Sequence, residues 1–401
     1  MADPLAFFAD EFSGAREIFL GASETLGAGT ATYLHPDEKG LRGEDISIDA
    51  CRFGPEDADV VLVTVSGTHG GEGYAGSAMQ AYAMEAGMLS TLPEGVAILQ
   101  IHAANPFGMS HYIRTNENNV DMNRNWIDFD NPPEKNLLYD PIFDGLPPPG
   151  APSLDHVRTW LAAFEELVGV HGRWEVDNAL TSGQYHRPDG LAYGGHGPQW
   201  SRRTLTTIFQ EMLGQPRHVA YLDWHTLLRT GNGNLIFLCF NQTNDPLFER
   251  AGQWWGREAI DRETVNAQWS TGTAASARRP SRSGLMMWGV QNLLAPQADV
   301  AGAVIEFCTD PHPELSPDEM QTFEMVCEQY LQSTRDFTSP TGQEAVNILR
   351  EATTPKSTAF REGVIAAGSK ALGAALDGAG QWAAENVPAA PGVLQTQSAF
   401  E

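Results

Sequence analysis

A histidine and a glutamate stand three positions apart in VLVTVSGTHGGEGYAGSAMQ, residues 61–80. His69 and Glu72 follow an apolar run, and the glycines around them permit a tight turn in which both side chains could reach one ion. An HxxE pair alone is weak support for a metal site, because a turn histidine beside a carboxylate at a helix N-terminus gives the same letters. The pair needs a third ligand elsewhere in the chain.

A second histidine, His225, ends the apolar run HVAYLDWH at residues 218–225. Two histidines and one glutamate form a ligand set that holds zinc in a tetrahedral site and leaves its fourth position open for water. Two ligands close in sequence and one distant ligand on another strand would assemble such a site. We therefore predict that His69, Glu72 and His225 bind Zn²⁺.

One carboxylate interrupts the apolar run AGAVIEFC at residues 301–308. Burying Glu306 without a partner or a task would cost free energy. One interpretation is a buried pair with an arginine. The second interpretation is a general base that takes a proton from a water molecule at the metal and passes it to the leaving amine.

The segment HYIRTNENNVDMNRNW, residues 111–126, carries Arg114 and Arg124, the only lysine or arginine residues between Arg52 and Lys135. A guanidinium group can bind a carboxylate through two parallel hydrogen bonds or stabilise an oxyanion. The segment could instead be a solvated polar loop, which fits poorly beside the metal motif.

Five apolar runs that end at glycine or polar residues predict the strands of the fold: 58–67, 95–105, 218–225, 234–241 and 301–308. They are apolar throughout rather than alternating, which is typical of parallel strands covered on both faces. Helices are expected at 74–89, 153–172, 201–213, 316–337 and 357–380, and Ser316 with Glu319 predicts a capping box at the start of the fourth. We expect an α/β fold with a mostly parallel mixed sheet flanked by helices.

This fold would form one catalytic domain over residues 1–380, followed by a tail at 381–401. Loops are expected at 128–153 and 267–289. In open α/β sheets ligands bind outside the carboxyl ends of the strands. That rule would bring the HxxE turn, His225, Glu306 and the arginine-bearing segment to one edge of the sheet.

The charge of the chain excludes some partners. The 401 residues include 51 acidic and 25 basic ones, a formal net charge of −26 that repels phosphate backbones and anionic lipids. We therefore expect no nucleic-acid or membrane partner. The N-terminus is acidic where a signal peptide would be basic, and the four cysteines lack CxxC spacing, so a cytoplasmic location is expected.

Several motifs together resemble the zinc metallocarboxypeptidase superfamily, which includes carboxypeptidase A-like peptidases and the succinylglutamate desuccinylase and aspartoacylase deacylases. The chain is most similar to a branch catalogued only as a domain of unknown function, from about Ala15 to about residue 380. That similarity rests on SGTHGGEGYAGSAMQ, NPFG, NVDMNRNW, GQYHRPDGLAYGG with PQWS, and LDWHT.

The resemblance implies a role for each matching residue. His69, Glu72 and His225 would bind zinc, and Glu306 would be the catalytic base. Arg114 would polarise the scissile carbonyl, and Asn123 with Arg124 would hold a substrate carboxylate.

Two features of the chain bear on the substrate pocket. The segment 183–200 could be a lid whose Tyr185 or Tyr193 touches substrate, or a packed structural loop. The chain also departs from the branch at Gly71, where an apolar residue is usual, and after His225, where TLLRTGNG with Arg229 replaces Thr-Gly-Leu-Gly.

The predicted function is zinc-dependent hydrolysis of an amide bond next to a free carboxylate, in a small peptide or an N-acyl amino acid. Carboxypeptidase and deacylase activities both fit. The chain could also be a non-catalytic protein that binds zinc or a carboxylated ligand, or an esterase that uses Ser66 or Ser77. No GxSxG motif surrounds either serine, which disfavours the esterase.

Overall fold

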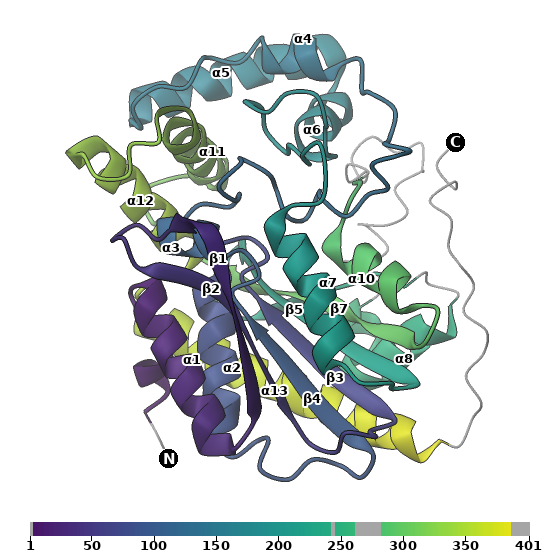
Figure 1. Cartoon of the computed structure of the whole chain (residues 1–401). Helices are drawn as coiled ribbons and strands as arrows, with labels where there is room; N and C mark the ends of the chain where they lie inside the picture. The colour runs from purple at the N-terminus through teal and green to yellow at the C-terminus, as the bar shows by residue number, and fades with distance from the viewer. Residues whose placement is uncertain (1–2, 242–244, 261–281, 311, 386–401) are drawn as a thin grey trace.

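A computed structural model describes residues 3–241, 245–260, 282–310 and 312–385. At its centre is a seven-stranded sheet with strand order β1-β2-β4-β3-β5-β7-β6 (Figure 1). The strands are β1 (Gly29–Lys39), β2 (Asp45–Phe53), β3 (Val60–Ser66), β4 (Val96–His102), β5 (His218–Leu228), β6 (Leu235–Cys239) and β7 (Asp299–Thr309).

The middle of the sheet is parallel, as the uninterrupted apolar runs predict. β4, β3, β5 and β7 pair in parallel, whereas β1, β2 and β6 pair antiparallel at the two sides. All seven residues of β3 and all seven of β4 are buried, because helices cover both faces. The prediction of an α/β fold with a mostly parallel mixed sheet is confirmed.

Two strands and one helix near the N-terminus were not predicted. β1 is largely solvent-facing, and β2 buries the polar residues Ser47 and Asp49 among its apolar ones. Arg16, on helix α1 (Phe12–Leu26), donates to both of these side chains. The long-range pairing with Arg16 lets β2 bury Asp49, and no local pattern reveals it.

Helices cover the two faces of the sheet with different sets of apolar side chains. One face packs against α1, α2 (Gly73–Glu85), α8 (Pro246–Trp255) and the long α13 (Thr358–Ala384), and the short helix η1 (Pro4–Phe7) joins them. The other face packs against α7 (Trp200–Met212) and α10 (Met286–Leu294) (Figure 1). These layers leave the carboxyl ends of the parallel strands at one end of the molecule.

A group of helices lies beyond that end, at the top of Figure 1. It comprises α4 (Tyr139–Phe143), α5 (Leu154–His171), α6 (Arg173–Thr181), α11 (Pro317–Thr334) and α12 (Pro340–Thr353), with α3 (Pro106–His111) below them. Val157, Trp160 and Val326 belong to the small apolar cluster of this region. The predicted capping box is present at the start of α11, between Ser316 and Glu319.

Several predicted boundaries need correction. The expected loop 128–153 contains α4, and α10 begins at Met286 inside the expected loop 267–289. Residues 267–281 and 386–401 lie outside the described residues. The helix expected to end at residue 380 runs to Ala384.

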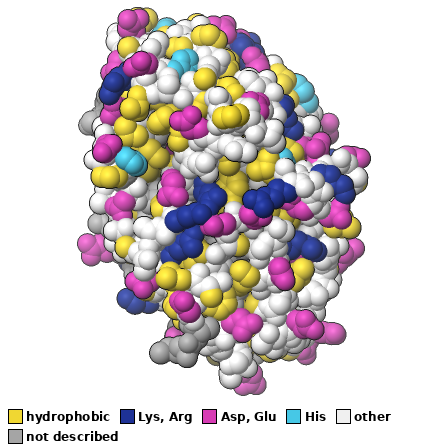
Figure 2. Space-filling model, turned by 90° about the vertical axis from the view of Figure 1, so that its left-hand side faces the viewer, with side chains coloured by type: hydrophobic (Ala, Val, Ile, Leu, Met, Phe, Trp, Pro, Cys, Tyr) yellow, Lys and Arg dark blue, Asp and Glu magenta, His cyan; other side chains and the backbone are white. Residues whose placement is uncertain are grey.

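Charged side chains are unevenly placed on the surface. Figure 2 shows one face of the molecule, where lysine and arginine side chains gather across the middle among scattered acidic ones. Arg350, Lys356 and Arg361 all lie within ion-pair distance of Asp10, so part of the basic charge fastens the N-terminal segment to α12 and α13. Among the described helices, none has the length and apolar composition that crossing a bilayer requires.

Candidate metal centre

The turn after β3 positions His69 and Glu72. The chain leaves β3 at Ser66, and Glu72 is the residue immediately before α2. A side chain at Gly70 would overlap the main chain of Gly108, and one at Gly71 would bring its Cβ within 3.0 Å of the Tyr112 carbonyl oxygen. The glycines therefore let the turn pack directly against α3 and the start of the following loop.

Three side chains converge at this turn. His225 lies on β5, the hydrogen-bonded neighbour of β3, where Ser66 pairs with Trp224. Nδ1 of His69 is 2.9 Å from Oε1 of Glu72, and Nδ1 of His225 is 2.9 Å from Oε2 of the same carboxylate. The two Nδ1 atoms are 3.2 Å apart, and all three residues are buried. The three predicted ligands are brought together although 153 residues separate Glu72 from His225.

The chemistry of this donor set fits a divalent cation. Two imidazole nitrogens and a carboxylate oxygen are one of the ligand sets found at catalytic zinc sites. Although burial opposes ionisation, the two histidines lower the pKa of Glu72 below its ordinary value. Burial also opposes charge on His225, but Asp223 and Glu72 raise its pKa well above the ordinary value. The site therefore concentrates negative charge around the Nδ1 atoms, as a cation requires.

A carboxylate lies near the Nε2 atom of each of the two histidines. Nε2 of His225 is 3.1 Å from Oδ2 of Asp223, and Nε2 of His69 is 3.4 Å from Oδ1 of Asp121. These are ion-pair distances without the alignment of a hydrogen bond. The other oxygen of Asp223 accepts a hydrogen bond from the Thr68 hydroxyl at 2.8 Å. Such outer carboxylates orient metal-binding histidines and keep the opposite nitrogen facing the ion.

Glu306 lies beside the three candidate ligands. On β7 it pairs in register with His225 on β5, so the two residues are direct cross-strand neighbours. In the described part of the chain, its buried Oε2 atom accepts no hydrogen bond and no ion pair joins Glu306 to an arginine. Burial raises the pKa of Glu306 to about 7, with His225 opposing the shift and Glu72 adding to it. A carboxyl group with this pKa can exchange a proton near neutral pH.

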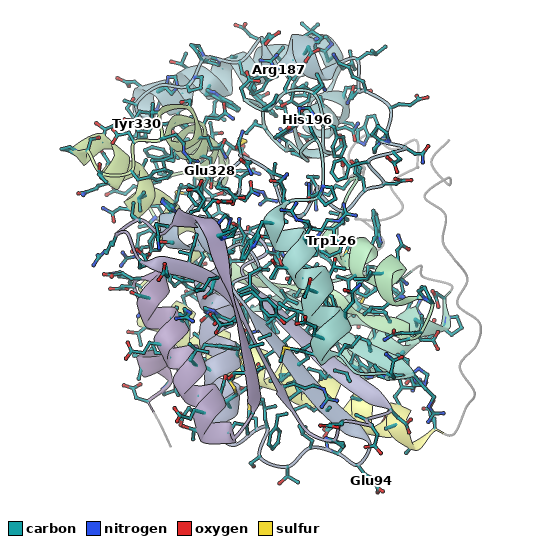
Figure 3. The ribbon with its side chains drawn as sticks, viewed as in Figure 1. Glu94, Trp126, Arg187, His196, Glu328 and Tyr330 are labelled. Atoms are coloured by element: carbon teal, nitrogen blue, oxygen red, sulfur yellow. The ribbon has the colours of Figure 1, made fainter. Side chains whose placement is uncertain are left out.

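Among the described lysines and arginines, Arg114 is the one within ion-pair distance of a candidate ligand. Its Nη1 atom is 3.3 Å from Oε1 of Glu72, and its Nε atom donates to Oδ2 of Asp121 at 3.0 Å. The main-chain N–H of Arg114 donates to Oε1 of Glu328 at 2.6 Å. Glu328 lies on α11, above the sheet in Figure 3. The side chain is 41% exposed, so its remaining N–H groups can reach a ligand.

Asn123 and Arg124 lie deeper in the same loop. The Asn123 side-chain oxygen accepts the main-chain N–H of Met286 at 2.8 Å. The guanidinium of Arg124 is buried and donates to the carbonyl oxygens of Thr181 and Asn123. Among the described residues, no carboxylate forms an ion pair with Arg124. Its direct hydrogen bonds in that part of the chain are therefore to main-chain dipoles.

The segment 183–200 packs on this loop. The carbonyl of Tyr193 accepts the main-chain N–H of Asp121 at 2.8 Å, and the Asn125 amide donates to the carbonyls of Gly194 and Gly197. Tyr193 is buried, and its ring contacts His196 edge to face. These contacts are those of a packed loop that supports Asp121.

The two serines considered for an esterase are buried inside the fold. Ser66 donates to the side chain of Gln80, and Ser77 lies 3.1 Å from Nε2 of His102. Neither is more than 2% exposed. A substrate cannot reach either hydroxyl in this structure.

Four polar residues near the centre were missed from the sequence: Asp121, Asp223, Glu324 and Glu328. Asp223 had a readable signal, because it stands two positions before His225 and so faces the same side of the strand. Burial raises the pKa of Glu324 and of Glu328 to about 8, and the nearby Glu72 charge adds to both shifts. Their place near Arg114 depends on how α11 docks, which no local pattern predicts.

Solved structures with related folds include carboxypeptidases. Carboxypeptidase A from Helicoverpa armigera is 12% identical, with a TM-score of 0.42, over 86% of this chain and 74% of that chain. A metallo-carboxypeptidase from Pseudomonas aeruginosa is 15% identical, with a TM-score of 0.36, over 84% and 70%. Bovine thrombin-activatable fibrinolysis inhibitor is 9% identical, with a TM-score of 0.41, over 86% and 99%.

In sequence, no curated protein matches this chain. A family profile does match, over residues 8–367, which include every residue of the candidate centre. The chain belongs to the family described as "Protein of unknown function (DUF2817)".

Proposed function

We propose that this protein is a zinc-dependent hydrolase that cleaves an amide bond next to a free carboxylate. One observation carries the proposal: the ligand atoms of His69, Glu72 and His225 all lie within 4.8 Å of one another. Glu306 stands beside them with a buried oxygen that has no hydrogen-bond partner among the described residues. In a cluster with only a structural role, a buried carboxyl group would be expected to have a hydrogen-bond partner.

Each residue of the candidate centre would have its own chemical role. Zinc bound by the two histidines and Glu72 would act as a Lewis acid and lower the pKa of a water molecule. Glu306 would accept the proton of that water as its oxygen attacks the amide carbonyl. It would then deliver the proton to the amine nitrogen as the C–N bond breaks. Arg114 would donate hydrogen bonds to the oxyanion that the attack creates.

The substrate carboxylate would bind at Arg124, with Asn123 and Tyr193 in the surrounding wall. A buried guanidinium without an acidic ion-pair partner in the described part of the chain is a favourable site for an anionic group. Small peptides with a free C-terminus and N-acyl amino acids both carry a carboxylate next to the bond to be cut. Cleavage of either would use the same centre.

The four cysteines support a cytoplasmic location for this activity. Cys51, Cys239, Cys308 and Cys327 form no disulfide in the described part of the chain, and all four are buried. Free thiols without disulfides are typical of reducing compartments.

Metal analysis combined with an activity panel tests the proposal. The purified protein is expected to hold one zinc ion per chain and to hydrolyse a member of a panel of C-terminal peptides and N-acyl amino acids. Glu306→Gln is expected to keep the zinc and lower turnover by about 10²- to 10⁴-fold. Glu351→Gln, an exposed glutamate on α12, is the matched control and is expected to retain turnover.

The panel also separates the candidate functions. Activity confined to N-acyl amino acids would identify a deacylase. Zinc binding without turnover of any substrate by the wild-type protein would contradict the hydrolase and identify a non-catalytic binding protein.

A further inference from the structure

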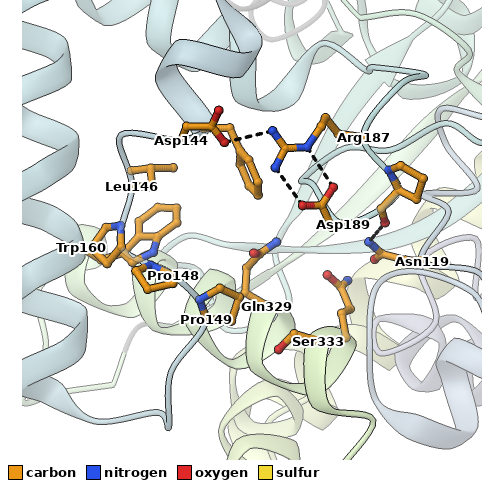
Figure 4. Close-up of a pocket in the computed structure, with 14 residues that line it drawn as sticks. Asn119, Asp144, Leu146, Pro148, Pro149, Trp160, Arg187, Asp189, Gln329 and Ser333 are labelled. Atoms are coloured by element: carbon orange, nitrogen blue, oxygen red, sulfur yellow. Dashed lines mark hydrogen bonds and ion pairs between the residues drawn. The ribbon is translucent and has the colours of Figure 1, made fainter.

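A cavity of about 710 Å³ opens among the helices beyond the sheet (Figure 4). One side is formed by Leu146 and the three prolines 147–149, together with Trp160 from α5. The opposite side is formed by residues 187–189, and α11 supplies the floor. None of the candidate zinc ligands lines this cavity. Its volume is within the range of sites that bind small organic molecules or short peptides.

The floor holds one polar group that lacks a partner in the described part of the chain. The side-chain amide of Gln329 makes no hydrogen bond with any described residue, although the residue is only 6% exposed. In Figure 4 this amide points from α11 into the cavity. Buried polar groups in native proteins nearly always have a partner, so this amide favours a ligand that accepts hydrogen bonds.

The charges around the cavity disfavour an anionic ligand. Arg187 is the basic residue of the lining, and both oxygens of Asp189 and one of Asp144 accept its hydrogen bonds (Figure 4). These two carboxylates exceed the single positive charge, so the rim repels a phosphate or a carboxylate. Apolar proline and tryptophan surfaces with an amide that can both donate and accept are complementary to an uncharged peptide main chain.

The cavity is linked to the candidate metal centre through α11. Gln332 lines the cavity, and its amide donates to Oε2 of Glu328 and to the Thr115 hydroxyl. Glu328 in turn holds the main-chain N–H of Arg114. Asn119, from the loop that carries Arg114, also lines the cavity. The same helix and the same loop therefore form the cavity and one wall of the centre.

We propose that this cavity binds the peptide main chain on the N-terminal side of the bond that is cut. The proposal rests on the proposed function, in which the free carboxylate sits at Arg124. An enzyme that removes one C-terminal residue can contact an extended substrate only on the other side of the bond. The cavity would therefore make the protein a carboxypeptidase that prefers peptides to N-acyl amino acids.

A length series tests the cavity. The substrates are N-acetylated amino acids and N-acetyl peptides in which one to four alanines precede the same terminal residue. Wild-type kcat/KM is expected to rise about tenfold or more with length. Gln329→Leu is expected to lower the ratio of long-substrate to short-substrate kcat/KM by about tenfold, the effect of one or two lost hydrogen bonds. Gln321→Leu, at an exposed position of the same helix, is the control and should keep the ratio.

A binding measurement separates this proposal from the hydrolase proposal. N-acetyl-tetraalanine amide has no carboxylate and probes the cavity alone. Calorimetry should show that it binds the wild-type protein and the Gln321→Leu variant, and that Gln329→Leu binds it about tenfold more weakly. This result would support the cavity even if no substrate were hydrolysed. A wild-type protein that does not bind the peptide, or equal binding by both variants, would overturn the cavity proposal and leave hydrolysis of N-acyl amino acids untouched.

Discussion

Two buried polar groups lie on the same sheet and contain the same kinds of residue. In one, Asp49 on β2 faces His102 on β4 across the strands. In the other, His69 and Glu72 from the turn after β3 meet His225 on β5. Each group also has its own arginine, Arg16 in the first and Arg114 in the second.

The two groups differ in how their polar atoms are arranged. Asp49 accepts hydrogen bonds from Arg16, Thr32 and Ser47, so its carboxylate is satisfied within the fold. Burial lowers the pKa of His102 to about 4, which keeps that imidazole neutral. At the candidate metal centre, by contrast, two imidazole nitrogens and a shared carboxylate converge on one point. Burial of histidines and carboxylates is therefore common to both groups, and only convergence marks a ligand site.

Loss of a candidate ligand should have the largest effect. His225→Ala is expected to remove bound zinc and lower turnover by at least about 10⁴-fold, because both the Lewis acid and the activated water are lost. Metal content and activity of the purified variant are the measurements. His102→Gln, which changes the other group, should keep its zinc. Loss of zinc from His102→Gln as well would break the contrast between the two groups.

The two arginines should respond differently to the same substitution. Arg114→Met is expected to lower kcat by about 10²- to 10³-fold with zinc retained, since it removes an oxyanion donor. Arg16→Met should destabilise the fold, because Asp49 would stay buried without its cationic partner. Steady-state kinetics and denaturant unfolding of both variants provide the measurements. An unchanged kcat in Arg114→Met would rule out the role assigned to this residue.

His102, the neutral histidine that faces Asp49, predicts a pH dependence of stability. The pKa of His102 is about 4 in the fold and 6.5 in the unfolded chain. Between these values the unfolded chain binds more protons, so stability falls as the pH falls from 6.5 toward 4, by ~3 kcal/mol for this histidine. Urea unfolding across this range should show a smaller fall in His102→Gln. Burial also lowers the pKa of His111 to about 4, so part of the dependence should remain.

Of the four predicted effects, we expect the smallest from a substitution of Asp223, the carboxylate next to His225. Asp223→Asn is expected to weaken zinc binding by about 10- to 100-fold, because the imidazole loses the charge that orients it. Competition with a chromogenic chelator measures the affinity. An affinity equal to that of the wild-type protein would mean that the charge of Asp223 is not needed to orient His225.

The sequence predicted those features that depend on local pattern. Continuous apolar runs identified β3, β4, β5, β6 and β7, and the capping box located the start of α11. The HxxE turn and a histidine at a strand end led to the three candidate ligands, because the carboxyl ends of neighbouring parallel strands share an edge.

Features that depend on long-range packing were not predicted. β2 was missed because its buried Asp49 is compensated by Arg16, which lies 33 residues away. Glu328 and Gln329 follow each other on α11, yet one reaches Arg114 and the other a cavity. That division is decided by the docking of α11 between the sheet and α5. The period of the helix alone cannot decide it.

The pairing of β3 with β5 has a consequence for how the fold opens. These strands are neighbours along seven residue pairs at the middle of the sheet, from Val60 and His218 to Ser66 and Trp224. An ion held by His69 and His225 would cross-link them non-covalently, and a ligand that binds only the native state makes global opening less favourable. Amide hydrogens of both strands should then exchange more slowly with zinc bound than after chelation. The ion would therefore stabilise the pairing of β3 with β5 in the middle of the sheet, in addition to taking part in a reaction at the edge of the sheet.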